Sequence, residues 1–338
     1  MIRDAAGLID AGLARPEARA ALDATGERYA VAITPAIRAL IQSPDDPIGR
    51  QFIPDPAELD HRPHELADPI GDEAHSPVPG LVHRYPDRVL LKPVLVCPVY
   101  CRFCFRREHV GPGAGALSPD QIEAALAYIA ARPAIREVIL TGGDPLMMSA
   151  RRLGALLGRL AAIEHVELTR IHSRVPVADP DRIDDEMAQI LGRHPTWLVL
   201  HANHATEFSP DAAAALGRLR RAGVPLLGQS VLLRGINDSA EALENLFRAM
   251  LRAGIKPYYL HQLDPAPGTA RFHVPIEEGR RLLSQLRGRV TGLAWPTYVL
   301  DITGGHGKVP IGPEYLEADA VRDPAGQRHA LAGPGRAV

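Results

Sequence analysis

The sequence has only three cysteines in 338 residues, and all three lie in one eight-residue run. Because no cysteine elsewhere could pair with them, a disulfide framework is excluded, and we expect a reducing compartment, the cytoplasm. No apolar run reaches the ~20 residues that a membrane-spanning helix needs, and the start Met1-Ile2-Arg3-Asp4 places charge where a signal peptide would be apolar. The charges nearly cancel, with 38 basic and 40 acidic residues, which disfavours a general nucleic-acid binder. We therefore expect a soluble cytoplasmic protein with no membrane or nucleic-acid partner.

The three cysteines follow C-x3-C-x2-C spacing, in the run from Cys97 to Cys104 (CPVYCRFC). Thiolates bind iron and zinc, and four of them normally close a site, so three leave one iron of a cubane cluster open. The spacing resembles that of the radical S-adenosylmethionine (SAM) enzymes. This resemblance implies that Cys97, Cys101 and Cys104 hold a 4Fe–4S cluster whose open iron binds SAM. A zinc site completed by a histidine such as His109, or three buried thiols, is the alternative, but scattered core cysteines would not converge on one loop.

From about residue 89 onward, short apolar runs alternate with longer amphipathic ones. The predicted strands are Val89–Val96, Glu137–Thr141, Val166–His172, Trp197–His201, Pro225–Leu232 and Lys256–Gln262. The predicted helices span about 119–132, 150–163, 180–193, 210–222, 239–253 and 277–289. Strands that alternate with crossover helices predict an α/β fold with a parallel sheet. An open doubly wound sheet would show the same pattern, but we favour a partial (β/α)6 radical-SAM barrel because chemically distinctive residues follow several strands, where barrels carry their sites.

The rest of the chain is predicted to flank this barrel. Residues 1–80 form an N-terminal segment, with short helices to about residue 43 and an extended, proline-rich wrapping stretch after it. Residues 81–265 form the radical-SAM barrel core. Residues 266–338 form a C-terminal segment that carries one more apolar run, Pro296–Ile302, then a glycine-rich turn and a tail whose last dozen residues are expected to be loose.

A second motif, Gly142-Gly143-Asp144, follows the second predicted strand. Adjacent glycines let the backbone approach a ligand closely, and a neighbouring carboxylate accepts bonds from an amine. A strand-to-helix turn explains the glycines equally well. After a radical-SAM cysteine loop, however, Gly142, Gly143 and Asp144 resemble the segment that cradles the SAM amino group.

The third feature is Lys308, which ends the glycine-rich turn Gly304-Gly305-His306-Gly307. Small neighbours leave the amine of such a lysine accessible, which suits attack on an aldehyde to form a Schiff base. A lysine in a flexible surface loop is the default interpretation, and only the wider context decides between the two.

That context is a resemblance to lysine 2,3-aminomutase, in register from about residue 44 to about residue 316. It is carried by His83–Leu91, the cysteine loop with Phe105–Arg107, Gly142–Leu146, Gln229–Asp238, Tyr258–Asp264 and Tyr298–Pro310. The resemblance implies an isomerase that moves the 2-amino group of L-lysine to carbon 3, giving β-lysine. It implies three cofactors: the 4Fe–4S cluster, SAM as the source of a 5′-deoxyadenosyl radical, and pyridoxal 5′-phosphate (PLP).

The resemblance also implies which residues hold these cofactors. Lys308 matches the lysine that forms the Schiff base with PLP. The other matching positions are, for PLP, Arg84, Tyr85, Arg88 and Gln229, and for SAM, His201 beside the glycine motif. Two guanidiniums near one phosphate make chemical sense, although a solvated charge patch would look the same in the sequence.

Three further charges match the positions that select the substrate. Arg106 matches the residue that clamps the substrate carboxylate, and Asp264 and Asp301 match the pair that receives the distal ammonium of lysine. Two carboxylates facing one cation would repel an acidic side chain, which favours lysine over glutamate. Considered alone, Asp264 is explained equally well as a turn residue, and Asp301 as a capping residue.

The resemblance leaves the branch of the family open. The compact length and the segment Arg170–Pro176 resemble a shorter branch that makes (R)-β-lysine for attachment to elongation factor P, and we prefer this branch. Asp301 and the turn Gly304–Lys308 look more like the longer catabolic form. An electron donor such as flavodoxin or ferredoxin is expected as a partner, and a homo-oligomer is compatible with the sequence. The alternatives are a radical-SAM maturase without PLP, an aminomutase for another amino acid, and a non-enzymatic iron–sulfur or zinc module.

Overall fold

The computed structural model describes residues 1–111, 114–318 and 320–331. Its centre is a nine-stranded sheet whose strands lie in chain order. The strands are β1 (Leu81–Tyr85), β2 (Arg88–Val94), β3 (Glu137–Gly142), β4 (Leu168–Ser173), β5 (Thr196–His201), β6 (Leu226–Val231), β7 (Lys256–His261), β8 (Thr297–Ile302) and β9 (Gly307–Pro310). Strands β2 to β8 pair in parallel, and β1 and β9 pair antiparallel at the two edges. A doubly wound sheet would reverse its strand order at a switch point, so the barrel prediction is confirmed.

The two edges of the sheet approach each other, so the barrel is nearly closed. The hydroxyl of Tyr85, at the end of β1, accepts a hydrogen bond of 2.7 Å from the backbone N–H of Lys308 on β9. Gly307 permits this approach, because a Cβ there would lie 3.2 Å from the Tyr85 hydroxyl and its φ of +98° disfavours other residues. Strands β8 and β9 thereby add residues from the end of the chain to the barrel wall.

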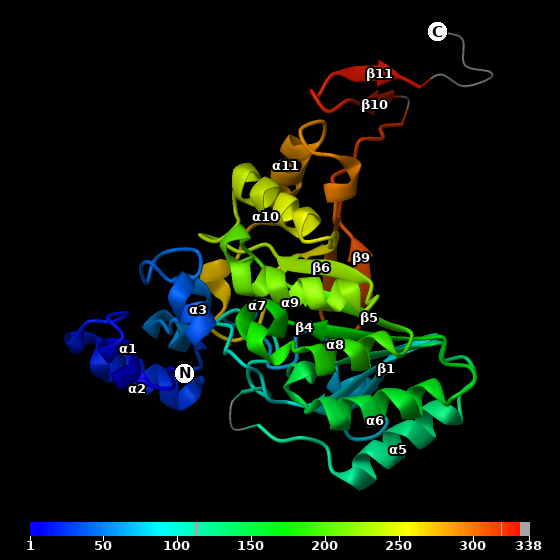
Figure 1. Ribbon diagram of the computed structural model, residues 1–338. Helices are drawn as coiled ribbons and strands as arrows, with labels where there is room; N and C mark the ends of the chain where they lie inside the picture. Colours follow the sequence, from blue (N-terminus) through cyan, green and yellow to red (C-terminus); the bar gives the residue numbers. More distant parts are fainter. Residues whose placement is uncertain (112–113, 319, 332–338) are drawn as a thin grey trace.

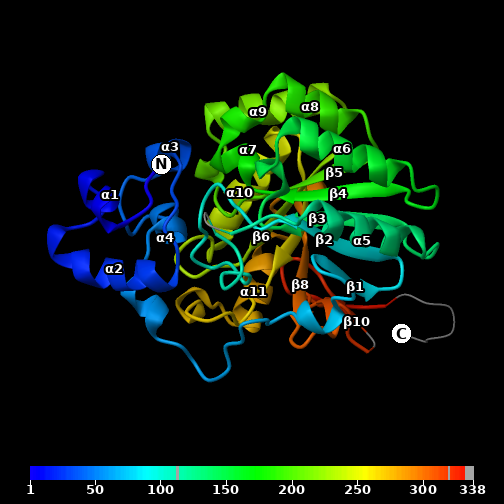
Figure 2. The same cartoon turned by 90° about the horizontal axis from the view of Figure 1, so that it is seen from below.

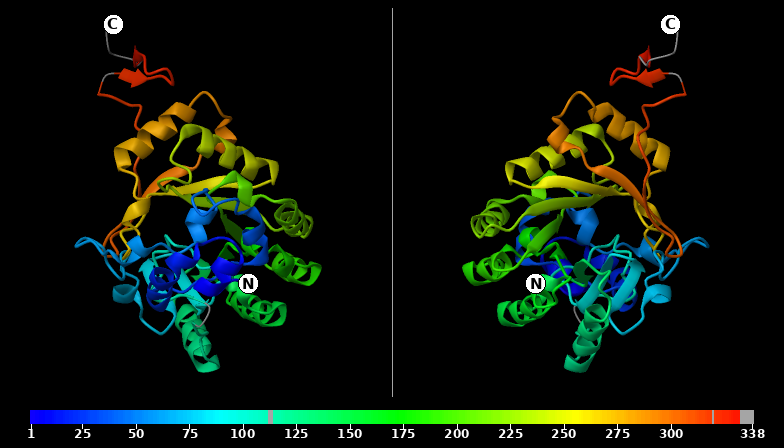
Figure 3. Two further views of the ribbon diagram at one scale, coloured as in Figure 1. Left: turned by 90° about the vertical axis from the view of Figure 1, so that its left-hand side faces the viewer. Right: turned by 90° about the vertical axis from the view of Figure 1, so that its right-hand side faces the viewer.

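Six helices of eight or more residues follow the parallel strands in the described chain and surround the sheet (Figures 1 and 3). They are α5 (Pro119–Ala130), α6 (Ala150–Ala161), α8 (Asp185–Gly192), α9 (Pro210–Arg221), α10 (Ala240–Arg252) and α11 (Ile276–Leu286). Helix α10 shows why they pack there: Leu243, Leu246, Phe247 and Met250 recur on one face, and all four are buried in the core shared with the strands.

The predicted strands and helices are found with small changes in their bounds. The largest change is in the predicted helix 180–193. Residues Pro180–Arg182 form a separate 3₁₀ turn, and α8 begins only after Asp184, whose side chain caps it by accepting a 2.8 Å bond from the Met187 N–H. A short helix directly after β4, α7 (Val175–Ala178), has no counterpart among the predicted helices.

The N-terminal part of the chain lies to one side of the barrel (Figure 2). Its helices are α1 (Ala5–Asp10), α2 (Arg19–Arg28), α3 (Pro35–Leu40) and α4 (Gly49–Phe52). They form a separate apolar cluster that also takes in Val99 of the cysteine loop and Ala178 of α7. The N-terminal helices therefore pack against the loop that carries the cysteines.

At the other end of the chain, a hairpin of β10 (Ala320–Arg322) and β11 (Arg328–Ala330) projects from the body (Figure 1). The Asp323 carboxylate holds its turn by accepting bonds from the N–H groups of Ala325 and Gln327. The prediction of a loose tail is therefore wrong for Arg328–Ala330, and its last residues, 332–338, lie outside the described chain. Within the described ranges, no helix has the length and apolar character that crossing a bilayer requires.

Candidate active site

One cavity in the barrel, of about 750 Å³, is lined by every site residue predicted from the sequence. These residues are Arg84, Tyr85, Arg88, Cys97, Cys101, Cys104, Arg106, Gly142, Gly143, Asp144, His201, Gln229, Asp264, Asp301 and Lys308. Several stand at or just beyond the carboxyl ends of parallel strands, where barrel enzymes carry their chemistry. The volume lies in the upper part of the roughly 300–1,000 Å³ range of small-molecule sites.

The three cysteines reach the cavity from the loop between β2 and α5, and each is partly exposed. Burial, together with the charge of Cys101, raises the pKa of the Cys104 thiol to about 11, so a cation is needed to hold these groups as thiolates. Among the residues that the structure describes, no three His, Cys, Asp or Glu side chains converge as they would on one metal ion. A cubane cluster does not need such convergence, because the three thiolates bind three different irons. The donor set therefore fits an iron–sulfur cluster.

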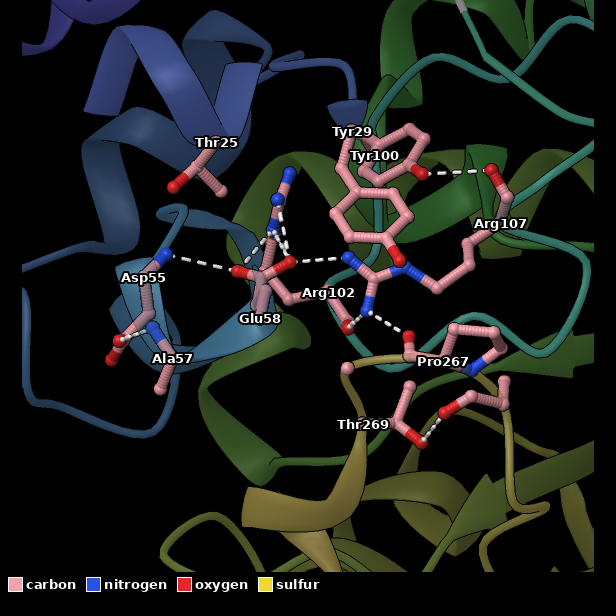
Figure 4. Close-up of polar contacts among 12 residues, drawn as sticks. Thr25, Tyr29, Asp55, Ala57, Glu58, Tyr100, Arg102, Arg107, Pro267 and Thr269 are labelled. Carbon is pink, nitrogen blue, oxygen red and sulfur yellow. Dashed lines mark hydrogen bonds and ion pairs between the residues drawn. The ribbon is translucent and has the colours of Figure 1, made fainter. Parts of the chain in front are cut away.

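The cysteine loop is held in place by a buried charge cluster of Glu58, Arg102 and Arg107 (Figure 4). Arg102, between the second and third cysteines, donates to Glu58 from Nε at 2.9 Å and from Nη2 at 2.6 Å. Arg107 also donates to Glu58, and its Nη1 reaches the carbonyls of Arg102 and Pro267, each at 3.1 Å. These bonds tie the loop to the N-terminal segment and to the chain after β7. No local sequence pattern indicates this cluster, because Glu58 lies 44 residues from Arg102.

A third buried arginine, Arg174 after β4, contacts the cysteine loop directly. Its Nη1 lies 3.1 Å from the Sγ of Cys101, and its Nη2 is bonded to Gln51 at 2.5 Å and to Glu207 at 2.7 Å. A positive group beside one thiolate favours the charged form of that sulfur. Arg174 was not singled out from the sequence, although it lies in the segment used there to distinguish the two branches.

The glycine motif brings the end of β3 against the chain that leads into the cysteine loop. A Cβ on Gly143 would lie 2.4 Å from the carbonyl carbon of Leu95, so only glycine fits. The Asp144 carboxylate accepts bonds from Ser173 Oγ at 2.8 Å and from the Arg174 N–H at 2.7 Å, among others. Both its oxygens are thus used inside the protein, and the backbone of the motif is what faces the cavity.

Lys308 projects from β9 into the cavity, opposite the charged end of β8. Its Nζ is ion-paired with Asp301 and lies 3.2 Å from Nδ1 of His261, the last residue of β7. Burial alone would raise the pKa of Asp301. The contacts of its carboxylate with His261 and Lys308 outweigh this effect and hold the pKa well below its usual range. His261 was missed in the sequence. It stands three residues before Asp264, and a search for strand-end residues that face Lys308 would have found it.

Asp264 carries an unpaired carboxylate oxygen in the same cavity. Its Oδ1 is buried and has no hydrogen-bond partner. Burial, together with the nearby charge of Asp301, raises the pKa of Asp264 to about 7. A carboxylate in this condition gains a partner when a cation binds beside it.

Arg106 is paired with a carboxylate that the sequence did not reveal. Its Nε and Nη2 donate to Oδ2 of Asp72 at 3.0 and 2.8 Å. Arg84 donates to Oδ1 of Asp72 at 3.3 Å, and the Lys92 Nζ lies 3.6 Å from Oδ2. Burial alone would raise the pKa of Asp72. The positive charges of Arg106, Lys92 and Arg84 outweigh this effect and hold the pKa below its usual range. Three cations around one carboxylate leave this side of the cavity positive, which suits anionic ligand groups.

The remaining predicted cofactor residues lie on neighbouring elements. Arg88 stacks on the ring of Tyr85, with 3.8 Å between the guanidinium carbon and the ring centre. Gln229 on β6 is the register partner of His201 on β5. The Gln229 Oε1 is buried without a partner, as is Nε2 of His172 on β4. Unpaired buried polar atoms are costly, so the cavity is built to receive a polar ligand.

Comparisons with known proteins agree with this site. The chain matches the family models "Radical SAM superfamily" over residues 91–247 and "Lysine-2,3-aminomutase" over residues 283–323. It is 43% identical to L-lysine 2,3-aminomutase of Fusobacterium nucleatum, over 86% of this chain and 69% of that protein. It is 41% identical to L-lysine 2,3-aminomutase of Escherichia coli, over 80% and 79% of the two chains. Glutamate 2,3-aminomutase of Clostridioides difficile is 36% identical, over 86% of this chain and 69% of that protein.

The two family models together take in the cysteine loop, the glycine motif and the segment with Lys308, so the likeness is not confined to one motif. The chain therefore belongs to the lysine 2,3-aminomutase family of radical SAM enzymes, isomerases that work with a 4Fe–4S cluster, SAM and PLP.

Proposed function

We propose that this protein moves the 2-amino group of L-lysine to carbon 3, with PLP attached to Lys308. The observation that carries the proposal is that one cavity contains three thiols, the Lys308 side chain and two carboxylates suited to a distal ammonium. A maturase without PLP would have no use for a lysine held in this position. An electron carrier would have no use for the two aspartates.

When bound, the cluster and SAM supply the radical that removes a hydrogen from the substrate, and PLP supplies the π system through which the nitrogen moves. Cys97, Cys101 and Cys104 would hold the cluster. Because Asp144 is fully used inside the protein, we assign the SAM amino group to the backbone of Gly142 and Gly143.

The residues assigned to PLP have separate tasks. Lys308 is its attachment point. Arg84 and Arg88 bind the phosphate by charge, and Tyr85 orients Lys308 through its bond to the lysine backbone N–H. Gln229 offers its unpaired oxygen to a donor on the ligand.

Arg106, Asp264 and Asp301 would orient the substrate at its two ends. Arg106 is assigned to the substrate carboxylate. Its pairing with Asp72 supports this assignment, because it shows that the Arg106 guanidinium binds a carboxylate in this position. The unpaired oxygen of Asp264 supports its assignment to the distal ammonium. A glutamate side chain would bring a third negative charge to Asp264 and Asp301, so lysine is the preferred substrate even though a relative acts on glutamate.

We also propose that the product is (R)-β-lysine and that it serves the modification of elongation factor P. The segment Arg170–Pro176 supports this branch, whereas Asp301 and the glycine-rich turn resemble the catabolic form. Chiral chromatography of the product decides between them, since the S enantiomer would contradict the assignment. Reduced flavodoxin or ferredoxin is the proposed electron donor.

Borohydride reduction followed by peptide mass spectrometry tests the PLP proposal. We expect one phosphopyridoxyl adduct, on Lys308, and none in Lys308→Ala, which should still bind the cluster. Lys256 is the matched control and should carry no adduct. It is also a partly buried lysine, but its Nζ is bonded to the carbonyls of Pro257 and Trp295, at 2.7 and 2.6 Å. An adduct that persists on another lysine in Lys308→Ala would move the active site, and the absence of any adduct in the native protein would refute the PLP proposal.

A further inference from the structure

We propose that His261 is a catalytic acid–base residue, which moves the proton of the Lys308 ε-amino group whenever PLP is joined to that lysine or released from it. The inference rests on the proposed function, because it takes Lys308 as the point of PLP attachment. It assigns a task to a residue that lies within the segment Tyr258–Asp264 but received no role from the sequence.

Three adjacent strands fix the geometry. His261 ends β7, Asp301 lies on β8 and Lys308 on β9, where Asp301 and Lys308 are direct register partners. The Nδ1 of His261 lies 3.2 Å from the Lys308 Nζ and 3.6 Å from the Asp301 Oδ2. The imidazole therefore touches the atom that must gain and lose a proton.

The hydrogen-bond pattern fixes the form of the imidazole. A lysine ammonium can only donate, so Nδ1 must accept and the ring proton sits on Nε2. That Nε2 is buried and has no partner. The groups that face the ring are Lys308, Asp301, the Tyr259 ring at 5.6 Å and, through charge, His172 and His201. Burial and the Lys308 charge lower the pKa of His261, so the ring is neutral and able to accept a proton.

Asp301 cannot do this work equally well. It is the counter-ion of the Lys308 ammonium, and its contacts with His261 and Lys308 hold the pKa of Asp301 low despite its burial. A proton placed on so weak a base returns at once, whereas an imidazole is a better match to an amine near neutral pH. Asp301 is therefore the group that holds Lys308, and His261 the group that activates it.

The proposed step balances in protons and electrons. His261 Nδ1 takes one proton from the Lys308 ammonium, and the freed amine pair bonds to the aldehyde carbon of PLP. His261 then returns this proton to the aldehyde oxygen and carries a second proton from the nitrogen to the same oxygen, which leaves as water as its bond to carbon breaks. The nitrogen keeps its third proton in the new bond to carbon. No oxidant or reductant is needed. The same residue performs the reverse when the substrate amine displaces Lys308.

The test measures how fast PLP attaches to the apoprotein, followed by absorbance in stopped flow between pH 5 and pH 9. General acid–base residues contribute about 10²–10⁴-fold, so His261→Gln should slow attachment by that factor. The native protein should show a fall in rate as the pH drops below 6.5, the ordinary pKa of histidine, and His261→Gln should lack this limb. In His261→Ala, added imidazole should restore much of the rate. His165→Gln is the matched control, because His165 is not among the residues that line the cavity and its Nε2 bonds to the Ile129 carbonyl.

Borohydride trapping at equilibrium separates this inference from the proposed function. Native protein and His261 variants should all carry PLP on Lys308 once attachment is complete. If the native protein carries none, the proposed function fails. If PLP is on Lys308 but His261→Gln attaches it at the native rate with the native pH profile, or imidazole restores nothing in His261→Ala, then the role of His261 is wrong.

Discussion

Asp264→Asn isolates the charge that we assign to the distal ammonium of lysine. The substitution keeps the size of the side chain and much of its hydrogen bonding. It removes one charge from a buried oxygen that has no hydrogen-bond partner among the described residues. Truncating one partner of a desolvated charge pair costs about 2–5 kcal/mol. At about 1.4 kcal/mol per decade, lysine turnover at low substrate should fall by roughly 30-fold to several thousand-fold.

The same residue predicts a pH dependence with a definite sign. Because the pKa of Asp264 is raised to about 7, the carboxyl is largely protonated below that pH, and a proton must leave before the ammonium can pair with it. The apparent affinity for lysine should therefore rise as the pH increases through about 7 and level off above it. Asp264→Asn should lack this step.

The assay is equilibrium binding of lysine and of norleucine, which lacks the distal ammonium, to protein that carries PLP, from pH 6 to pH 8.5. Asp264→Asn should weaken lysine binding and leave norleucine unchanged. Asp179→Asn is the matched control, since burial also raises the pKa of Asp179 but the residue lies outside the cavity. If Asp264→Asn bound lysine with the native affinity and pH dependence, the assignment of Asp264 to the distal ammonium would be wrong. The argument from this residue that lysine is the substrate would then fail.

Three further substitutions test other parts of the site. Cys101→Ala should leave a folded protein that neither retains a full complement of iron and sulfide nor cleaves SAM; full SAM cleavage would overturn the cluster assignment. Glu58→Gln should lower the unfolding free energy by about 3–5 kcal/mol, because it leaves the Arg102 and Arg107 charges buried without their partner, and an unchanged thermal midpoint would contradict this. Arg106→Lys should raise the KM for lysine without loss of PLP, because an ammonium cannot reproduce a two-nitrogen carboxylate contact; an unchanged KM would place the substrate carboxylate elsewhere.

The barrel was predictable because its signals are local. Each parallel strand is a short apolar run, and each helix begins at a polar cap and repeats its apolar residues every three or four positions. Alternation of the two then restricts the topology to parallel sheets with crossover helices. The edge strand β1 was not predicted, because it does not follow this pattern. Leu81–Tyr85 is half buried and pairs antiparallel with β2 across a two-residue turn.

The site was predictable only in part. The cysteines, the glycine motif and Lys308 carry unusual spacing, which the sequence displays directly. The partners of Arg106 and Arg102 do not, because Asp72 and Glu58 come from the proline-rich segment before the barrel and meet the arginines only through tertiary packing. His261 was hidden for a different reason: its contact with Lys308 depends on the pairing of β7, β8 and β9, which hydrophobic periodicity does not specify.

The most direct test of the central claim is anaerobic incubation of the reconstituted protein with SAM, a low-potential reductant and L-lysine labelled with ¹⁵N at the 2-amino group. We predict β-lysine with the label on carbon 3, formed only when SAM, PLP and the reductant are all present. Glutamate in place of lysine should give no rearranged product. Cleavage of SAM without labelled β-lysine, or rearrangement of glutamate in preference to lysine, would contradict the account.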